Sequence, residues 1–164
     1  KKISFEIGDV LNLSKYQNSF EHVITIRCLI NLDNKKKQIS ALKEIYKTLK
    51  KGGTYLMCEN FNENLENLNK LRKKFNLDKI KTRWHNKYLS NKEIKDYATK
   101  KLKFKILEER NFASSYYFLT RVVKPYLFKI NDKKLQYNDS FNTLASKFDS
   151  FGEFSPMKLI ILKK

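Results

Sequence analysis

Apolar positions along residues 20–60 predict a strand, a helix and a second strand in succession. The run that opens this stretch is β-branched and apolar with little alternation, which is typical of a strand covered on both faces. In residues 36–50, apolar side chains recur at helical spacing while lysines and a glutamate fall on the other side. Gly52 and Gly53 favour the left-handed conformation that ends such a helix, and residues 54–60 form a second apolar run. This order predicts a βαβ unit whose two strands pair in parallel.

The pattern predicts one strand before this unit and two after it. Residues 3–7 alternate apolar with polar side chains and predict a short strand that ends at Gly8. The runs at 104–109 and 157–162 predict two more strands, which we expect to pair antiparallel. Because no internal repeat, linker or low-complexity block interrupts the pattern, residues 1–164 are expected to form a single domain.

Helices and irregular segments are predicted between those strands. Residues 62–76 carry leucines and a phenylalanine on one helical face, so we expect a helix that covers the sheet. A capping-box pattern at 90–93 begins a short helix, and residues 139–148 also have helical spacing. Residues 79–89 have no clean period and predict a loop that could cover a pocket. The aromatic-rich stretch at 114–128 is compatible with a strand, a helix or a lid.

The charge of the chain bears on its partners. The formal net charge is +18, from 35 basic and 17 acidic residues, and such an excess is one sign of nucleic-acid binding. Only five of the basic residues are arginine, the residue preferred for forked contacts to phosphates and bases, and the lysines are spread over every segment. We therefore interpret the excess mainly as a solvated lysine surface. It still favours an anionic ligand or partner.

Composition sets the class of protein. With 164 residues, of which 41% are hydrophobic and 13% aromatic, the chain can form a folded core. No apolar run approaches the roughly 20 residues that a membrane span requires, and no targeting segment is visible, so we expect a cytoplasmic protein without a transmembrane segment. Cys28 and Cys58 are interpreted as small buried thiols. His22 and His85 complete no zinc-binding spacing with them, which argues against a metal site.

Three short segments stand in a recognisable order along the first part of the chain. They are Gly8-Asp9-Val10, the run Phe-Glu-His-Val-Ile-Thr at 20–25, and residues 39–53, which end in Leu-Lys-Lys-Gly-Gly. They resemble, in turn, the Gly-Asp-Ala after the third strand, the Phe-Asp-x-Val of the fourth and the Arg-Val-Leu-Lys-Pro-Gly-Gly before the fifth strand of class I S-adenosylmethionine-dependent methyltransferases. The resemblance implies an α/β fold, with a mostly parallel Rossmann-like sheet, flanking helices and an antiparallel carboxyl-terminal strand pair.

The resemblance also implies where S-adenosyl-L-methionine would bind. It places the Asp9 carboxylate at the adenine amino group and the Val10 backbone N–H at the adenine ring. The turn at Ile26 and Arg27 would lie beside the methionine part of the cofactor, where Arg27 could meet the cofactor carboxylate or an anionic substrate. The alternatives are an ordinary Gly-Asp turn for Asp9 and a surface arginine at a helix terminus for Arg27.

Two side chains are candidates for the base that methyl transfer needs when its nucleophile carries a proton. Glu59 ends the second strand of the βαβ unit, and His85 lies in the 79–89 loop. The alternatives are a strand-end carboxylate paired with a lysine, and a packed or surface histidine. Aromatic side chains that could line an acceptor pocket, or pack as core, are Trp84, Tyr88, Tyr116 and Tyr117.

The glycine-rich cofactor turn that follows the first strand of the family has no counterpart in this sequence, because none of the four glycines forms a Gly-x-Gly turn. We therefore expect a partial methyltransferase domain that lacks its first two strands. The strand at 20–26 would then be an exposed edge, which favours aggregation, or would pair with the strand at 3–7. We also expect this chain alone to bind S-adenosylhomocysteine weakly or not at all. A degenerate relative that binds no cofactor is the alternative.

The resemblance implies that the full-length protein transfers a methyl group to a small-molecule, sugar or lipid-linked acceptor. The residues after Thr25 do not form the Asn-Pro-Pro-Tyr or Asp-Pro-Pro-Tyr turn of enzymes that methylate amino groups of nucleic-acid bases, which disfavours a nucleic-acid acceptor. Two other classes stay open. A nucleic-acid-binding module would lose affinity steeply with salt, and a non-catalytic interaction domain would bind no cofactor.

Overall fold

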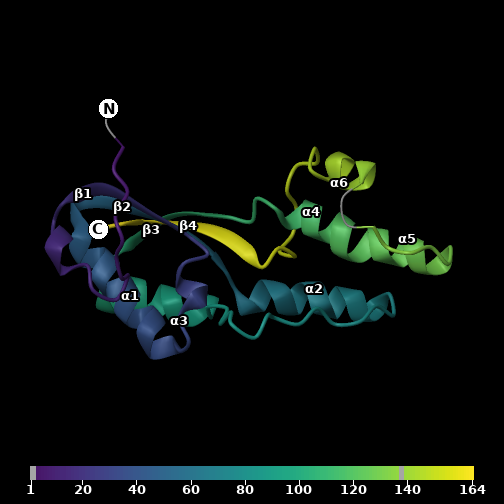
Figure 1. Ribbon diagram of the computed structural model, residues 1–164, viewed down its shortest axis with the longest axis horizontal. Helices are drawn as coiled ribbons and strands as arrows, with labels where there is room; N and C mark the ends of the chain where they lie inside the picture. The colour runs from purple at the N-terminus through teal and green to yellow at the C-terminus, as the bar shows by residue number, and fades with distance from the viewer. Residues whose placement is uncertain (1–2, 137–138) are drawn as a thin grey trace.

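The predicted βαβ unit forms the centre of the computed structural model, which describes residues 3–136 and 139–164 (Figure 1). The unit consists of β1 (Phe20–Ile26), α1 (Lys35–Thr48) and β2 (Leu49–Asn60). The two strands pair in parallel, with Val23 opposite Tyr55. A meander with antiparallel neighbours is therefore excluded, and the βαβ prediction is confirmed.

The end of α1 differs from the prediction based on the two glycines. The helix ends at Thr48, and Leu49 already has extended dihedral angles, with φ −73° and ψ 137°. Gly52, with φ +78°, and Gly53 lie within β2 instead. A Cβ atom on Gly53 would lie 2.9 Å from the carbonyl oxygen of Glu21 in the neighbouring strand, so the position requires glycine. The glycines serve the contact between strands, and the helix stops before them.

Two later strands complete the sheet as an antiparallel pair. They are β3 (Lys105–Arg110) and β4 (Met157–Lys163). The strand order is β1-β2-β4-β3, and β4 runs antiparallel to both β2 and β3. The α/β fold class and the closing strand pair are confirmed. The described sheet is mixed, with one parallel pair, where a mostly parallel sheet was expected, because β4 enters antiparallel between β2 and β3.

The strand predicted at residues 3–7 is not formed. These residues are irregular, and the side chains of Phe5 and Ile7 are 94% and 102% exposed. Alternating apolar residues do not make a strand where no neighbour accepts and donates the backbone hydrogen bonds. In the described residues β1 is therefore an exposed edge of the sheet, which is one of the two arrangements expected for it.

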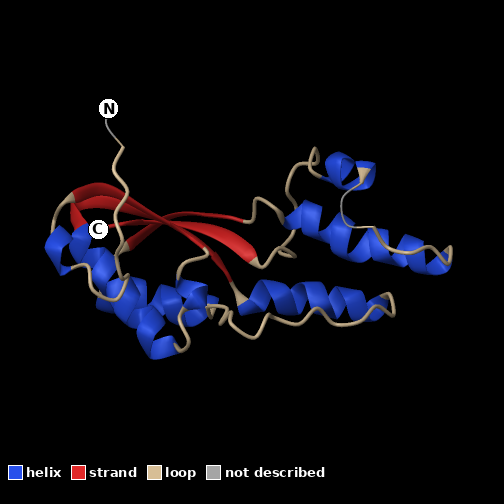
Figure 2. Ribbon diagram, in the orientation of Figure 1, coloured by secondary structure: helices blue, strands red, loops and turns tan. Residues whose placement is uncertain are grey.

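The helices fall into two groups (Figure 2). One group lies under one face of the sheet and consists of α1 and α3 (Asn91–Asp96), the latter continued by a π-helical turn at Tyr97–Lys101. The Ser90 hydroxyl accepts a hydrogen bond from the Glu93 backbone N–H, as the capping pattern predicted. The other group is α2 (Asn62–Lys74), α4 (Ser114–Phe118), the π-helical turn η4 (Leu119–Val123), α5 (Lys124–Ile130) and α6 (Ser140–Ala145).

The second group of helices lies beyond the sheet, so the prediction that residues 62–76 form a helix covering the sheet is wrong in its placement. Figure 1 shows α2 extending away from the strands beside α5, so α2 does not cover the sheet as expected. Leu65 and Leu68 of α2 pack with Val122 of η4 in a separate apolar cluster. The stretch at 114–128, which was compatible with three structures, is helical throughout. In the described part of the chain, no helix combines the length and apolar character needed to span a bilayer.

The two faces of the sheet differ in their cover. On one face, Tyr55, Met57 and Ile160 are completely buried in a core shared with α1 and α3. On the other face, Ile24 and Ile26 of β1 are 60% and 63% exposed. The apolar pattern of β1 predicted cover on both faces, and in the described residues only one face has it. This uncovered side is called the bare face below.

Candidate functional site

The segment that follows β1 lies at the edge of the sheet where both parallel strands end. Ile26 is the last residue of β1, and the backbone N–H of Arg27 donates to the carbonyl oxygen of Cys58 in β2 at 2.9 Å. Open α/β sheets bind their ligands at this carboxyl edge. The structure therefore brings Ile26 and Arg27, both predicted to contact a cofactor, to the edge where a ligand site is expected.

Glu59 holds the turn after β1 from within the sheet. Its side chain is completely buried, and its carboxylate accepts from the backbone N–H groups of Cys28 at 3.0 Å, Leu29 at 3.2 Å and Ile30 at 3.4 Å. Burial raises the pKa of Glu59, while these backbone donors act in the opposite direction. A role of Glu59 as a base stays a prediction. The hydrogen bonds give the carboxylate a second task, because they fix the position of the turn.

Arg27 has a backbone conformation that is uncommon for a side chain with a Cβ atom. Its φ is +52°, and left-handed dihedrals cost on the order of 1 kcal/mol in residues other than glycine. The conformation is held on both sides, because Asn31 Nδ2 donates to the Arg27 carbonyl at 2.8 Å and Glu59 binds the next amides. The Arg27 side chain is exposed at the end of the strand. The turn therefore presents a guanidinium group from a fixed backbone.

The loop at 79–89 is irregular, as predicted, and is tied to the same turn. Asn86 Nδ2 donates to Asn31 Oδ1 at 2.9 Å, and the Lys87 N–H donates to the Ile30 carbonyl at 2.7 Å. Beside these contacts, Trp84 is 89% exposed and meets the ring of His85 edge-on, with 5.2 Å between the ring centres.

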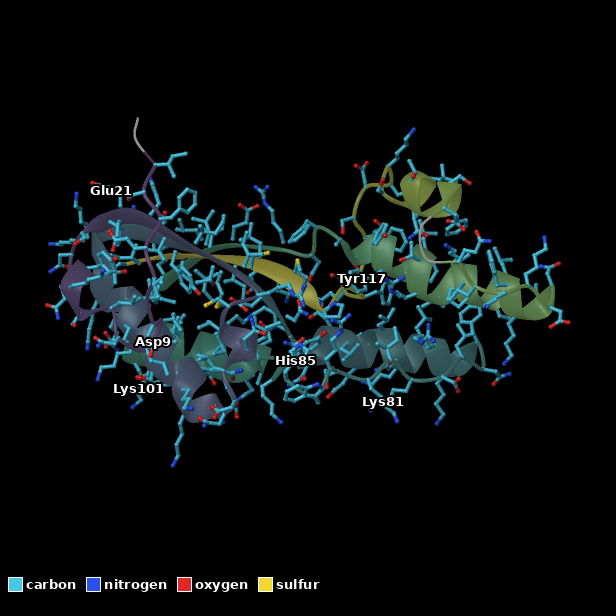
Figure 3. All side chains as sticks on the ribbon, viewed as in Figure 1. Asp9, Glu21, Lys81, His85, Lys101 and Tyr117 are labelled. Atoms are coloured by element: carbon cyan, nitrogen blue, oxygen red, sulfur yellow. The ribbon has the colours of Figure 1, made fainter. Side chains whose placement is uncertain are left out.

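Figure 3 shows His85 near the start of α2. The His85 ring is exposed to solvent, and its contact with a ligand at the strand ends stays a prediction.

Aromatic side chains from the 79–89 loop and from the second group of helices meet beyond the sheet. Tyr88 and Tyr117 both pack on the apolar cluster between α2 and η4. The guanidinium carbon of Arg121 lies 5.9 Å from the centre of the Tyr117 ring. Burial raises the pKa of the Tyr117 phenol, and the positive charges of Arg121 and Arg27 both oppose that rise. Two arginines from distant parts of the chain therefore act on one phenol.

Asn60 ends β2 at the same edge and was not singled out in the sequence. It is 5% exposed, and its Oδ1 accepts no hydrogen bond from the described residues. Its backbone carbonyl accepts from the Leu89 N–H at 2.9 Å. Buried polar atoms almost always have a partner, and Asn91 Oδ1 is a second buried acceptor without one in the described residues.

Asp9 and Val10 lie apart from this group. The Asp9 carboxylate accepts from the Leu11 backbone N–H at 2.9 Å, which is the ordinary turn that was the alternative for this residue. Val10 packs against the main core. Figure 3 shows Asp9 beside α1, away from His85 and Tyr117. The contact of Asp9 and Val10 with an adenine ring stays a prediction.

The two cysteines flank Glu59 and are free thiols, both half-buried. Burial raises the pKa of Cys28 and of Cys58, and the charge of Glu59 adds to the effect in both. Protonated thiols are weak nucleophiles, so neither is prepared for attack. Within residues 3–136 and 139–164, no cluster of histidine, cysteine, aspartate or glutamate side chains has the makings of a metal site.

Comparison with solved structures assigns the architecture to a known fold. A methyltransferase from Methanosarcina mazei, described as S-adenosylmethionine-dependent, superposes with a TM-score of 0.55 at 16% identity and covers 99% of this chain and 68% of its own. SpnF, described as a cyclase, superposes with a TM-score of 0.54 at 16% identity, and the match covers 98% of this chain and 55% of SpnF. A possible histamine N-methyltransferase from Thermotoga maritima superposes with a TM-score of 0.51 at 18% identity. The match covers 96% of this chain and 62% of that protein.

No family model and no curated protein matches the sequence. At these identities the likeness establishes the fold, which is that of class I S-adenosylmethionine-dependent methyltransferases with a Rossmann-like sheet. The chain spans 68%, 55% and 62% of the lengths of the three structures compared.

Proposed function

We propose that this chain is part of an S-adenosylmethionine-dependent methyltransferase that acts on a small-molecule, sugar or lipid-linked acceptor. The observation that supports it best is the turn after β1, which Glu59 holds at the carboxyl edge of two parallel strands in a methyltransferase-type fold. In this proposal the turn from Ile26 to Asn31 contacts the methionine part of the cofactor. Asp9 and Val10 contact its adenine.

The residues of the chain have distinct tasks in this proposal. The cofactor supplies a methyl group on a positively charged sulfur. The turn fixes the direction of approach, because a displacement requires the nucleophile and the methyl group in line. Tyr88 and Tyr117 exclude water from one side of the acceptor. Of the two predicted bases, we assign proton removal to the exposed His85 and the fixing of the turn to Glu59, whose carboxylate already accepts three hydrogen bonds.

A second candidate function is binding without methyl transfer. The neighbour SpnF, described as a cyclase, has the same fold, so the fold alone does not decide the reaction. The self-contained turn at Asp9 also favours this candidate, because its carboxylate is already occupied by a backbone N–H. Cofactor binding and methyl transfer must therefore be measured separately.

Calorimetry with S-adenosylhomocysteine tests the proposal. We expect the 164-residue chain to bind weakly or not at all, and a longer reading frame that contains it to bind tightly. Glu59→Gln in the longer chain should weaken binding, and Glu66→Gln, at an exposed position on α2, should not. Failure of the longer chain to bind would contradict the proposal. Binding without methyl transfer to any acceptor would favour the second candidate.

A further inference from the structure

We infer that the tip of the 79–89 loop, with Trp84 at its centre, binds the surface of an anionic lipid membrane. The link from this membrane to a lipid-linked methyl acceptor rests on the proposed function, whereas the membrane contact rests on the structure of the loop alone. Three observations support it: the almost complete exposure of Trp84, the fixed turn that carries it, and the basic side chains of the loop.

Trp84 is exposed to a degree that is uncommon for its residue type. It is the single tryptophan of the chain, and 89% of it is open to solvent. Tryptophan is highly buried on average, because its ring has a large apolar surface. The edge-on contact with the His85 ring therefore covers little of the indole. A large apolar ring in this position is available for contact with a partner outside the chain.

The turn that carries Trp84 is closed by its own backbone. Trp84 and His85 are its two central residues, and the Asn86 N–H donates to the Arg83 carbonyl at 3.0 Å. Asn86 is only 5% exposed, so one end of the turn is buried while its centre faces water. The exposed ring is thus part of a defined turn.

The loop is anchored to the rest of the chain on both sides of this tip. At its start, Asn69 of α2 bonds twice to the backbone of Ile80, accepting from its N–H at 2.8 Å and donating to its carbonyl at 3.0 Å. At its end, the Lys87 N–H donates to the Ile30 carbonyl at 2.7 Å, and Gln38 Nε2 donates to the Lys87 carbonyl at 2.7 Å. The tip is therefore presented from a fixed base, which reduces the entropy lost when it binds.

The charge of the loop has one sign. The loop contains no aspartate or glutamate, and its lysine and arginine side chains are all exposed: Lys79, Lys81, Arg83 and Lys87. Glu66 of α2 lines a hollow beside the first two, and the other two lie on either side of Trp84 in the sequence. Figure 3 shows Lys81 below α2, on the side away from α5. Basic side chains at such a surface attract anionic lipids.

An indole ring among basic side chains fits a lipid headgroup layer better than it fits a nucleic acid. Tryptophan favours the boundary between lipid and water, because its ring is apolar and its N–H is polar. The lysines and arginine around it can reach the phosphates and carboxylates of anionic headgroups. A single strand of nucleic acid is bound along a groove in which several rings stack on successive bases, whereas this tip offers one exposed indole.

The membrane contact would also serve the proposed reaction. His85, to which the proposed function assigns proton removal, is the residue next to Trp84 in the same turn. Binding of the tip at a membrane surface would bring a lipid-linked acceptor to this side chain. Among the three acceptor classes that the proposed function allows, the contact therefore favours the lipid-linked one.

Fluorescence of the single tryptophan tests the contact directly on the 164-residue chain. The probes are vesicles of equal parts phosphatidylcholine and phosphatidylserine, vesicles of phosphatidylcholine alone, inorganic phosphate, and a single-stranded oligonucleotide of mixed sequence. Salt at about the physiological level of 0.15 M screens general attraction to the basic surface. We expect the anionic vesicles to shift the emission of Trp84 to shorter wavelength and to protect it from quenching by acrylamide. The other three probes should leave the emission unchanged.

Variants separate this tip from the rest of the surface, with binding measured by flotation with the anionic vesicles. Trp84→Ala should weaken binding about tenfold, the value of one large apolar side chain. Arg83→Met should weaken it about fivefold, the value of one basic residue at an anionic membrane. Phe5→Ala removes another exposed ring, and Lys51→Met removes a charge near the start of β2. Each of these two controls should change binding by less than about twofold, because screening leaves distant charges little effect.

Each outcome decides the inference. Equal losses in Trp84→Ala and Phe5→Ala, or vesicle binding without a change in the emission of Trp84, would overturn it. A larger emission change with the oligonucleotide than with the vesicles would assign the tip to nucleic acid, and a change with inorganic phosphate would indicate a site for a free anion. If Trp84→Ala does not fold, judged by circular dichroism, the emission of the wild type and the loss in Arg83→Met still decide.

The membrane contact and the proposed function can fail separately. Binding of S-adenosylhomocysteine is measured by calorimetry without vesicles, so it does not depend on the tip. Absence of vesicle binding would overturn the inference and leave a methyltransferase with a water-soluble acceptor. Vesicle binding that depends on Trp84, in a longer chain that never binds the nucleoside, would contradict the proposed function alone.

Discussion

The two faces of the sheet are built from adjacent residues of the same strands, yet only one face is packed. In β4, Ile160 is completely buried and Ile161 is not, and in β1 Thr25 is 9% exposed beside Ile24 at 60%. The buried side chains share a core with α1 and α3. No helix in the described residues lies over the bare face, to which Ile24 and Ile161 belong. Apolar alternation shows what a strand is able to bury. Burial itself depends on whether another element is supplied to cover it.

The largest expected effect separates the two faces within one strand. Ile160→Ala removes buried atoms and leaves a cavity, so the free energy of unfolding should fall by about 2–5 kcal/mol. Ile161→Ala on the bare face should cost about 1 kcal/mol or less. Urea unfolding of both variants measures the difference. Equal losses would show that the bare face is covered in solution.

A substitution at Glu59 tests the polar part of the covered face. Glu59→Gln keeps the shape but replaces one acceptor oxygen by a donor, which leaves at least one buried N–H of the turn without its partner. We expect a loss of about 2 kcal/mol in unfolding free energy and faster hydrogen exchange at Cys28–Ile30. Glu66→Gln is the control and should stay within about 0.5 kcal/mol. Unchanged exchange rates would show that the turn does not depend on this carboxylate.

The pH dependence of that loss is a smaller effect with a definite sign. Because burial raises the folded pKa of Glu59 above its unfolded value of about 4.3, the folded chain binds more protons than the unfolded chain between the two values. The contribution of Glu59 to stability therefore falls as pH rises through that window, and stays lower above it. The advantage of the wild type over Glu59→Gln should shrink in urea unfolding as pH rises from about 4.3 through the raised pKa of Glu59. An advantage that grows with pH would mean that the backbone donors outweigh burial.

A substitution on the bare face should give the smallest change in the free energy of unfolding. The same substitution should also change self-association of the chain. Ile24→Lys should alter the free energy of unfolding by only about 0.5 kcal/mol, because the side chain is mostly exposed. It should reduce self-association, since a lysine on an edge strand blocks pairing with another chain. Sedimentation velocity measures this. Ser40→Lys adds the same charge on the exposed side of α1, and an equal reduction there would attribute the effect to charge alone.

Much of the fold could be predicted from local pattern. The βαβ unit, the loop at 79–89 and the closing strand pair follow from apolar spacing and capping residues, which depend on a few neighbours in sequence. Three predictions failed where a distant partner decides the structure. Residues 3–7 lack a neighbouring strand, α2 packs on a helix and not on the sheet, and Gly53 is required by the carbonyl of Glu21 in β1.

The candidate site was predictable in part for the same reason. The resemblance to methyltransferases pointed to Ile26 and Arg27, and the structure shows both at the carboxyl end of β1, while their contact with a cofactor stays a prediction. Tyr117 and Arg121 are four residues apart, a spacing that joins them only if the segment is a helix, and its sequence left the type open. The three amides at Glu59 come from residues about thirty positions earlier, and no sequence pattern signals such a contact.

The π-helical turn at Leu119–Val123 determines the direction in which the side chains of the following helix α5 point. A residue added to a helical turn rotates all later side chains by about 100°, since an α-helix has 3.6 residues per turn. Lys124 comes directly after it, and its amine is buried against Asp139 at 2.9 Å and Asn142 at 2.8 Å. We expect loss of one residue from the turn to swing this amine towards water and so to remove its contacts with Asp139 and Asn142 at the start of α6.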